Sequence, residues 1–149
     1  MTLEKNKRVV RRFLEDLFGT GNLDLLDELV APDAVHAAST SNWEPGREGF
    51  RKHVIWLHTA LSDIHLTVED LIAEGEHVVA FWTIRGTHQG DFWGAPPTGR
   101  HVVITAVSRL RVLNGQVCYG QFLPDRLGIL LQLGNLGRHT AQFAQATTT

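Results

Sequence analysis

Cysteine is almost absent from this sequence: Cys118 is the only one among 149 residues. A lone cysteine cannot form a disulfide within the chain, and chains without disulfides are typical of reducing compartments. The N-terminal segment MTLEKNKRVVRR carries charges where a secretory signal would carry an apolar stretch. We therefore expect a cytoplasmic protein.

Long apolar runs and an excess of one charge are also missing. The longest apolar stretch, near residues 127–133, is interrupted by Gly128 and is much shorter than the ~18 residues that span a bilayer. Lys and Arg number 14 and Asp and Glu number 16, which gives a formal charge of -2. This balance excludes the basic excess on which binding to nucleic-acid phosphates depends. We expect neither a membrane nor a nucleic acid as a partner.

What is present is the composition of one globular domain. Apolar residues make up 43% of the chain and charged residues 20%, a proportion that supplies a single core. The length also corresponds to one domain of roughly 100–200 residues. We expect residues 1–149 to form one domain, with residues 137–149 as a frayed tail.

The N-terminal third has helical periodicity. Between residues 2 and 18, apolar residues recur with helical spacing at Val10, Phe13, Leu14 and Leu17. Asn22 follows a glycine-containing break and is suited to cap a second, short helix. A third helix is predicted over about residues 46–61, with His53 on its apolar stripe.

Beyond Asp63 the apolar period changes to two, which is typical of strands. We expect strands on both sides of a turn at residues 74–76 and on both sides of Asn114-Gly115, a dipeptide favoured in tight hairpins. A short helix or loop follows over residues 127–136. This order predicts an α+β domain in which N-terminal helices pack on one face of a curved, mostly antiparallel sheet.

The Asn114-Gly115 turn also predicts the register of the last hairpin. Until a bulge intervenes, Gln121 lies beside Ser108, and Asp125 lies beside Ile104. One face of the hairpin then gathers polar groups among apolar residues: Ser108, Tyr119, Gln121 and Asp125. Cys118 falls on the opposite face.

Asp125 is the first catalytic candidate in this register. Withdrawal from water disfavours the charged form of a carboxyl group, which suits proton transfer near neutral pH. The alternative is that Asp125 caps the terminal helix, as aspartate often does. Pro124 next to it can introduce a bulge that changes the register.

Two stretches carry a more specific pattern, GTHQGDFWGAPPTGR at residues 86–100 and DRLGILLQLG at residues 125–134. Together with His36 and GREGF at residues 46–50, they resemble the SnoaL-like polyketide cyclase and ester cyclase family over about residues 5–134. The resemblance implies an NTF2-like fold, a cone of helices and curved sheet that encloses a pocket. It further implies an enzyme without metal or cofactor that closes a ring in a polyketide ester by intramolecular aldol chemistry, with Asp125 as general acid/base.

The chain also departs from this family. Members commonly carry Glu and Trp in the strand before the aspartate, where this sequence reads VCYGQFLP at residues 117–124. Since related sequences act as hydroxylases or other cyclases, the fold does not decide the reaction. The alternatives are another reaction type, including hydrolysis with Asp70 as a second carboxylate, and a non-catalytic module that binds small molecules.

His88 shares strand parity with Trp82, so both are expected to face the pocket. His88 is the second catalytic candidate, and its alternative is to bind the backbone of the glycine-rich loop. The residues expected to bind a polyketide-like, apolar or aromatic substrate are His36, Trp43, His53, Trp82, Phe92, Ser108, Tyr119 and Gln121. Among them, His36 and His53 have structural alternatives, and the loop residues Trp43 and Phe92 could instead anchor a dimer.

The sequence predicts neither a metal nor a cofactor. Eight histidines are present, yet none forms the i, i+4 pair with an adjacent Glu that is typical of a helical zinc site. Gly19 and Gly21 lack the third glycine and the preceding strand of a dinucleotide fingerprint. Val103 and Val107 on the outer face of the sheet predict a homodimer or a homotetramer, as the family resemblance also implies.

Overall fold

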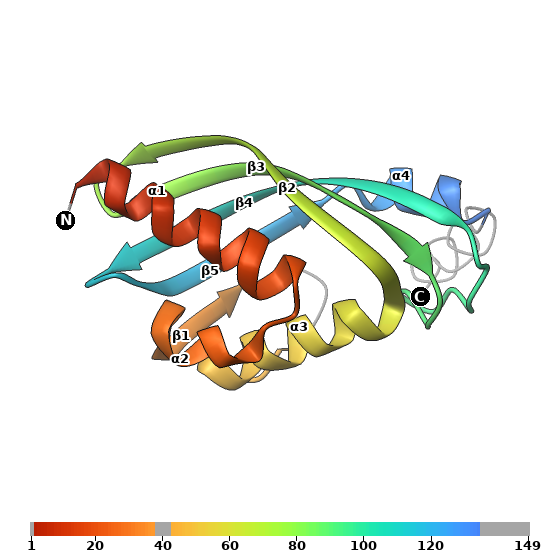
Figure 1. The fold of residues 1–149 in the computed structure, drawn as a ribbon, viewed down its shortest axis with the longest axis horizontal. Coiled ribbons are helices and arrows are strands. Elements are labelled where there is room, and N and C mark those ends of the chain that lie inside the picture. The colour runs from red at the N-terminus through yellow and green to blue at the C-terminus, as the bar shows by residue number, and fades with distance from the viewer. Residues whose placement is uncertain (1, 38–42, 135–149) are drawn as a thin grey trace, which may run out of the picture.

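The chain begins with helices, as the N-terminal periodicity predicts (Figure 1). The computed structural model describes residues 2–37 and 43–134; the tail predicted at residues 137–149 lies outside them. Helix α1 (Leu3–Arg11) continues as a π-helical segment, η1 (Arg12–Gly19). Thr2 caps α1, because its hydroxyl accepts a hydrogen bond from the Lys5 N–H.

The predicted cap at Asn22 is confirmed. Its side-chain oxygen accepts a hydrogen bond from the Asp24 N–H, at the start of a single 3₁₀ turn, η2 (Leu23–Leu25). Helix α2 (Leu26–Leu29) follows directly and passes into β1 (Val30–Ala37). The third predicted helix is α3, which buries its apolar stripe against the sheet. It spans Arg47–Ala60.

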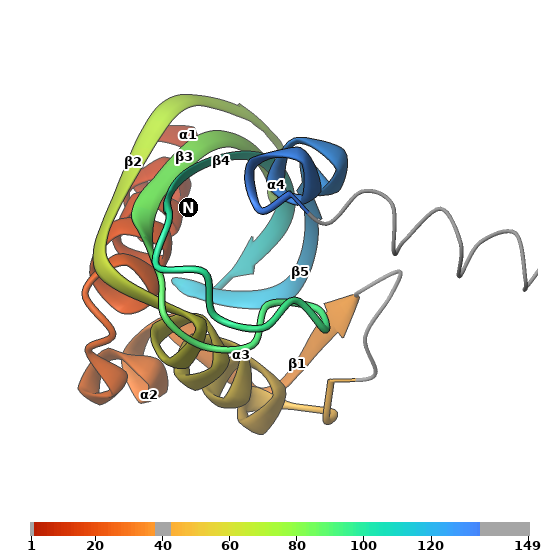
Figure 2. The same cartoon turned by 90° about the vertical axis from the view of Figure 1, so that its right-hand side faces the viewer.

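Four strands follow α3. They are β2 (Leu61–Glu74), β3 (His77–His88), β4 (His101–Leu113) and β5 (Gln116–Pro124). With β1 they form one sheet of order β1-β5-β4-β3-β2, in which only the β1–β5 pair is parallel. The sheet curves around its interior, and α3 lies across the open side between β1 and β2 (Figure 2). This architecture confirms the predicted α+β cone.

The last hairpin turns where the sequence predicts, but its register changes soon afterwards. Asn114 and Gly115 have φ values of 51° and 78°, the left-handed conformation that tight hairpin turns need. Val112 faces Val117, but the register then shifts so that Tyr119 faces Arg111. Cys118 is therefore an extra residue in β5, a β-bulge.

This bulge reverses the faces of β5. Because side chains alternate along a strand, one extra residue sends every later side chain to the other side of the sheet. Gly120 and Phe122 now pair with the inward-facing residues Leu110 and Ser108. The register predicted from the turn is thus wrong beyond Val117.

Of the two alternatives predicted for the last apolar stretch, helix or loop, the structure has a helix, α4 (Arg126–Gln132), which is tied to the edge of β4. Beyond the end of β5, the Gln132 side-chain oxygen accepts from the Val103 N–H at 2.8 Å, and its amide nitrogen donates to the Val103 carbonyl at 2.7 Å. The Arg126 guanidinium lies 4.3 Å from the ring centre of Trp93, in the loop between β3 and β4.

None of the described helices is long and apolar enough to cross a membrane.

We expect Gln132→Leu to destabilise the protein, because it leaves the Val103 N–H and carbonyl without their partner. The free energy of unfolding in urea should fall by about 1–3 kcal/mol. Leu131→Ala is the matched control: its side chain on the same helix is 55% exposed, and the change should stay within about 0.5 kcal/mol. Equal losses in the two variants would show that Gln132 does not anchor α4.

Candidate active site

A cavity of about 50 Å³ lies on the concave side of the sheet, between α3, α4 and the β3–β4 loop. Its walls are mainly aromatic: Phe18, His53, Trp56, Trp82, Phe92, Trp93 and Phe122. Aliphatic side chains such as Ile84, Ile104 and Ile129 complete the lining. The end of the cone that carries α4 and the β3–β4 loop faces the viewer in Figure 2.

Three of the residues predicted to bind substrate line this cavity: His53, Trp82 and Phe92. The indole N–H of Trp82 donates to the Ser108 hydroxyl at 2.9 Å, and Ser108 is fully buried. Ser108 therefore faces inward, as predicted, and holds the indole of Trp82. Substrate binding by these residues stays a prediction.

The predicted positions of Tyr119 and Gln121 in the pocket are wrong. Both follow the bulge at Cys118, so both point to the outer face, where Gln121 pairs with Arg109. The Arg109 guanidinium lies 5.6 Å from the Tyr119 ring centre and donates to its hydroxyl at 3.4 Å. From that side of the sheet neither residue reaches the aromatic cavity.

The predicted position of Asp125 beside Ile104 is wrong for the same reason. Its backbone N–H donates to the Thr105 carbonyl at 2.9 Å, which continues the shifted register. Its exposed carboxylate accepts from the Gly128 N–H at 2.9 Å. Asp125 therefore caps α4, which is the alternative to a catalytic role. Asp70, the second carboxylate considered for hydrolysis, is also exposed and pairs with outward-facing Phe81.

His88 faces inward, as its parity with Trp82 predicts, and is fully buried. Its Nδ1 accepts from the Thr98 N–H at 3.2 Å, and its backbone pairs with Gly99 and Arg100. These bonds hold the glycine-rich loop, which is the alternative to catalysis. The Nε2 of His88 has no partner among the described residues; the catalytic role stays a prediction.

The structure brings together two residues that the sequence treats separately. His36 on β1 and His53 on α3 are joined by a hydrogen bond of 2.8 Å between Nε2 of His36 and Nδ1 of His53. The Phe122 ring stacks on His36, with centres 5.0 Å apart and planes at 24°. Trp43 stacks on His53 at 4.8 Å and 22°. The two imidazoles are therefore enclosed by aromatic rings.

This enclosure lowers the pKa of both histidines. Burial lowers the pKa of His36 from 6.5 to about 4. Burial, together with the charge of His36, lowers the pKa of His53 to about 3. Both rings are therefore neutral at pH 7, and each can donate one hydrogen bond and accept another.

Several cavity residues were missed from the sequence, above all Phe122, Phe18 and Trp93. The register without a bulge would place Phe122 on the outer face, and the bulge at Cys118 turns it inward. Within residues 2–37 and 43–134, no three His, Cys, Asp or Glu side chains lie together as a metal ion would require. Independence from metals and cofactors stays a prediction.

Known families provide the remaining evidence. Residues 8–133 match the family model described as SnoaL-like polyketide cyclase. The chain belongs to this family. Nogalonic acid methyl ester cyclase of Streptomyces nogalater is 32% identical over 120 residues, covering 79% of this chain and 90% of that protein. Aklanonic acid methyl ester cyclase DnrD of Streptomyces peucetius is 30% identical over 129 residues, covering 85% and 88%.

Solved structures agree with this assignment. TsrD from Streptomyces laurentii superposes with a TM-score of 0.83 at 26% identity, over 91% of this chain and 99% of that chain. A SnoaL-like polyketide cyclase from Agrobacterium tumefaciens has a TM-score of 0.72 at 19% identity, over 89% and 98%, and supports the fold alone. The NTF2-like cone is confirmed, and so is the prediction that this SnoaL-like protein is an enzyme.

The partly buried pair His36–His53 predicts how stability depends on pH. Between pH 6.5 and their folded pKa values, both rings bind fewer protons in the folded chain than in the unfolded one. The free energy of unfolding is therefore highest, as far as these two rings determine it, above pH 6.5. It falls as the pH is lowered toward 4, by up to about 1.4 kcal/mol per pH unit for each ring. His36→Gln/His53→Gln should show a shallower decline in urea unfolding between pH 7 and 4.5. Parallel curves for the two proteins would contradict the lowered pKa values of the pair.

Proposed function

We propose that this SnoaL-like enzyme closes a ring in a polyketide-type ester by intramolecular aldol chemistry, without metal or cofactor. The observation that carries the proposal is the aromatic cavity on the concave face. Flat walls of Trp and Phe suit a planar, conjugated ligand, because aromatic rings stack face to face or edge to face. Membership of a polyketide cyclase family and relatives named as methyl ester cyclases support the same substrate class.

The proposed reaction requires few catalytic groups from the protein. A base removes a proton from a carbon next to one carbonyl, and that carbon attacks a second carbonyl of the same molecule. Holding the two ends in contact is worth ~7–11 kcal/mol of the barrier, and a positioned acid/base contributes ~10²–10⁴-fold. A shaped apolar cavity with one proton-transfer group is therefore sufficient.

Substrate entry requires side chains to move, since about 50 Å³ is smaller than a multi-ring ester. Phe92 and Trp93 lie in the loop between β3 and β4, and Ile129 lies on α4. The Arg126–Trp93 contact joins these two elements. We propose that they separate at this contact to admit the substrate.

The first test is ring closure of nogalonic acid methyl ester by the purified protein. We expect conversion to be unchanged after exhaustive chelation and without added nucleotide or flavin, because the proposed reaction needs only proton transfer. Loss of conversion on chelation and recovery with zinc would contradict the proposal. Binding of the ester without conversion would favour a non-catalytic binding module.

Asp125→Asn tests the acid/base role proposed from the sequence. Asn caps a helix about as well as Asp does, so the bond to the Gly128 N–H can be kept while proton exchange is lost. Because the carboxylate lies on the outer face, we expect turnover within about threefold of wild type. A fall of about 10²-fold or more, with unchanged stability, would restore Asp125 as the general acid/base.

We also propose a homodimer or homotetramer that forms through the outer face of the sheet. A groove there is lined by apolar side chains that include Phe81, which is 40% exposed, and Leu123, which is 52% exposed. A second copy would remove this apolar surface from water. Light scattering should give a multiple of the 16.6 kDa monomer, and Leu123→Glu should shift the mass toward one copy. A monomeric wild type at micromolar concentration would overturn this proposal.

A further inference from the structure

We propose that His53 exchanges protons with the substrate, and that His36 is a positioning residue that orients the His53 ring and shares its proton. The inference rests on the proposed function, because it concerns the same cavity. Neither role is visible in the sequence, where the two residues lie 17 positions apart on different elements.

The lining of the cavity singles out His53. Its Nδ1 is engaged by His36, so Nε2 is the ring nitrogen left for the cavity. The other polar atoms on the described lining side chains are the indole N–H groups of Trp56, Trp82 and Trp93, which can only donate. Among the described residues that line the cavity, His53 is thus the one whose side chain can accept a proton.

Aromatic rings hold both imidazoles in place. Trp43 stacks on one side of His53, and Phe18 meets it edge-on with centres 5.0 Å apart at 77°. Phe122 stacks on His36. These contacts hold the ring planes, so the direction of Nε2 is set before the substrate arrives.

His36 carries a second sign of function. Its Nδ1 is buried and has no hydrogen-bond partner in the described part of the chain. Buried polar atoms are nearly always paired, and the exceptions require an explanation. Because Nε2 of His36 accepts from the Nδ1–H of His53 in the proposed step, His36 carries its own proton on Nδ1, and this N–H is the group without a partner. In this tautomer Nε2 is free to take up the shared proton.

The proton balance of the step is complete within the pair and the substrate. His53 Nε2 takes a proton from the carbon next to a carbonyl, and the C–H electron pair becomes the enolate. The positive charge is shared through the Nδ1–H···Nε2 bond with His36. The enolate carbon then bonds to the second carbonyl carbon, whose oxygen becomes an alkoxide and recovers the proton from His53 Nε2. No oxidant, reductant or co-reactant is required.

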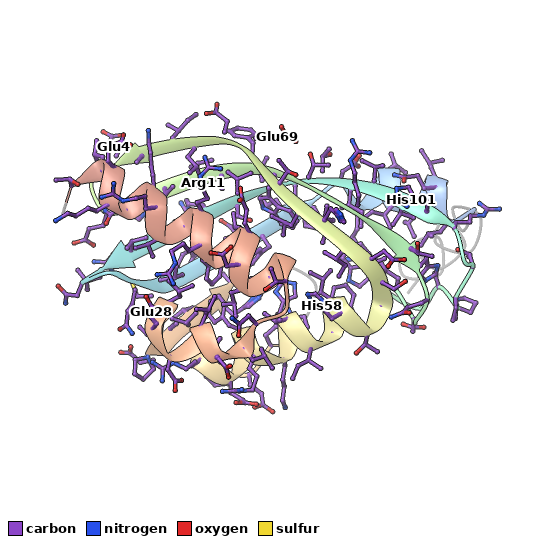
Figure 3. All side chains as sticks on the ribbon, in the orientation of Figure 1. Glu4, Arg11, Glu28, His58, Glu69 and His101 are labelled. Atoms are coloured by element: carbon purple, nitrogen blue, oxygen red, sulfur yellow. The ribbon has the colours of Figure 1, made fainter. Side chains whose placement is uncertain are left out.

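Substitution of His53 tests the catalytic part of the inference, with nogalonic acid methyl ester as the probe. We expect His53→Gln to lower kcat by about 10²-fold or more, with KM within about threefold. The matched control is His58→Gln on the same helix. His58, labelled in Figure 3, donates from Nε2 to the Phe18 carbonyl at 2.7 Å and does not line the cavity. Its kcat should stay within about threefold of wild type; a kcat for His53→Gln in that range would overturn the inference.

Chemical rescue tests the positioning part. His53→Ala leaves space for a free imidazole beside His36. We expect added imidazole to raise its turnover at least tenfold, and to fail in His53→Ala/His36→Phe, because no ring then orients the added base. A merely structural role for His36 would leave the rescue equal in both variants, and this outcome would overturn it.

Deuterium uptake separates failure of this inference from failure of the proposed function. In D₂O the wild-type protein should exchange the acidic C–H positions of the ester at least tenfold faster than His53→Gln does. Exchange without ring closure would support His53 and contradict the proposed cyclisation. Ring closure at equal rates in both proteins would overturn the role of His53 alone, and absence of both exchange and closure in wild type would overturn both proposals.

Discussion

One extra residue in β5 decides which side chains reach the interior of this protein. Cys118 forms a bulge in the last hairpin, and every side chain after it changes face. Phe122 consequently turns inward and covers His36, while Asp125 turns outward and caps α4. A hairpin without the bulge would place a carboxylate in the cone and the phenyl ring in solvent. The chemistry available to the cavity therefore follows from strand geometry.

Among residues 2–37 and 43–134 no carboxylate side chain is buried. Unpaired charges are costly to bury, and the aromatic rings stacked on His36 and His53 carry no charge that could offset one. Both rings are neutral at pH 7 and share one hydrogen bond. At pH 7 a negative charge that develops nearby, as on the enolate of the proposed step, would favour protonation of this pair. In that proposal, burial links proton transfer to the presence of the substrate.

The segment that carries much of the family resemblance, residues 125–134, has a clear structural use. Asp125 begins α4, and Gln132 replaces a missing strand neighbour for Val103. Arg126 joins the helix to Trp93 in the second resembling segment, residues 86–100. The two segments meet at the same end of the cone and close it. A recurring sequence pattern can therefore describe how a cavity is closed without stating which reaction takes place inside it.

The sequence by itself determined the local elements of this protein. Helical spacing around Val10, the cap at Asn22 and the Asn114-Gly115 turn act over a few residues, and each was predictable from its neighbours. The inward direction of Ser108 followed from the alternation of side chains along a strand. Only the tertiary structure decided the rest. The place of the bulge depends on the pairing of β5 with both of its neighbours, and the contact between His36 and His53 depends on how α3 packs against β1. These are contacts between distant segments, and a single sequence carries no local signal for them.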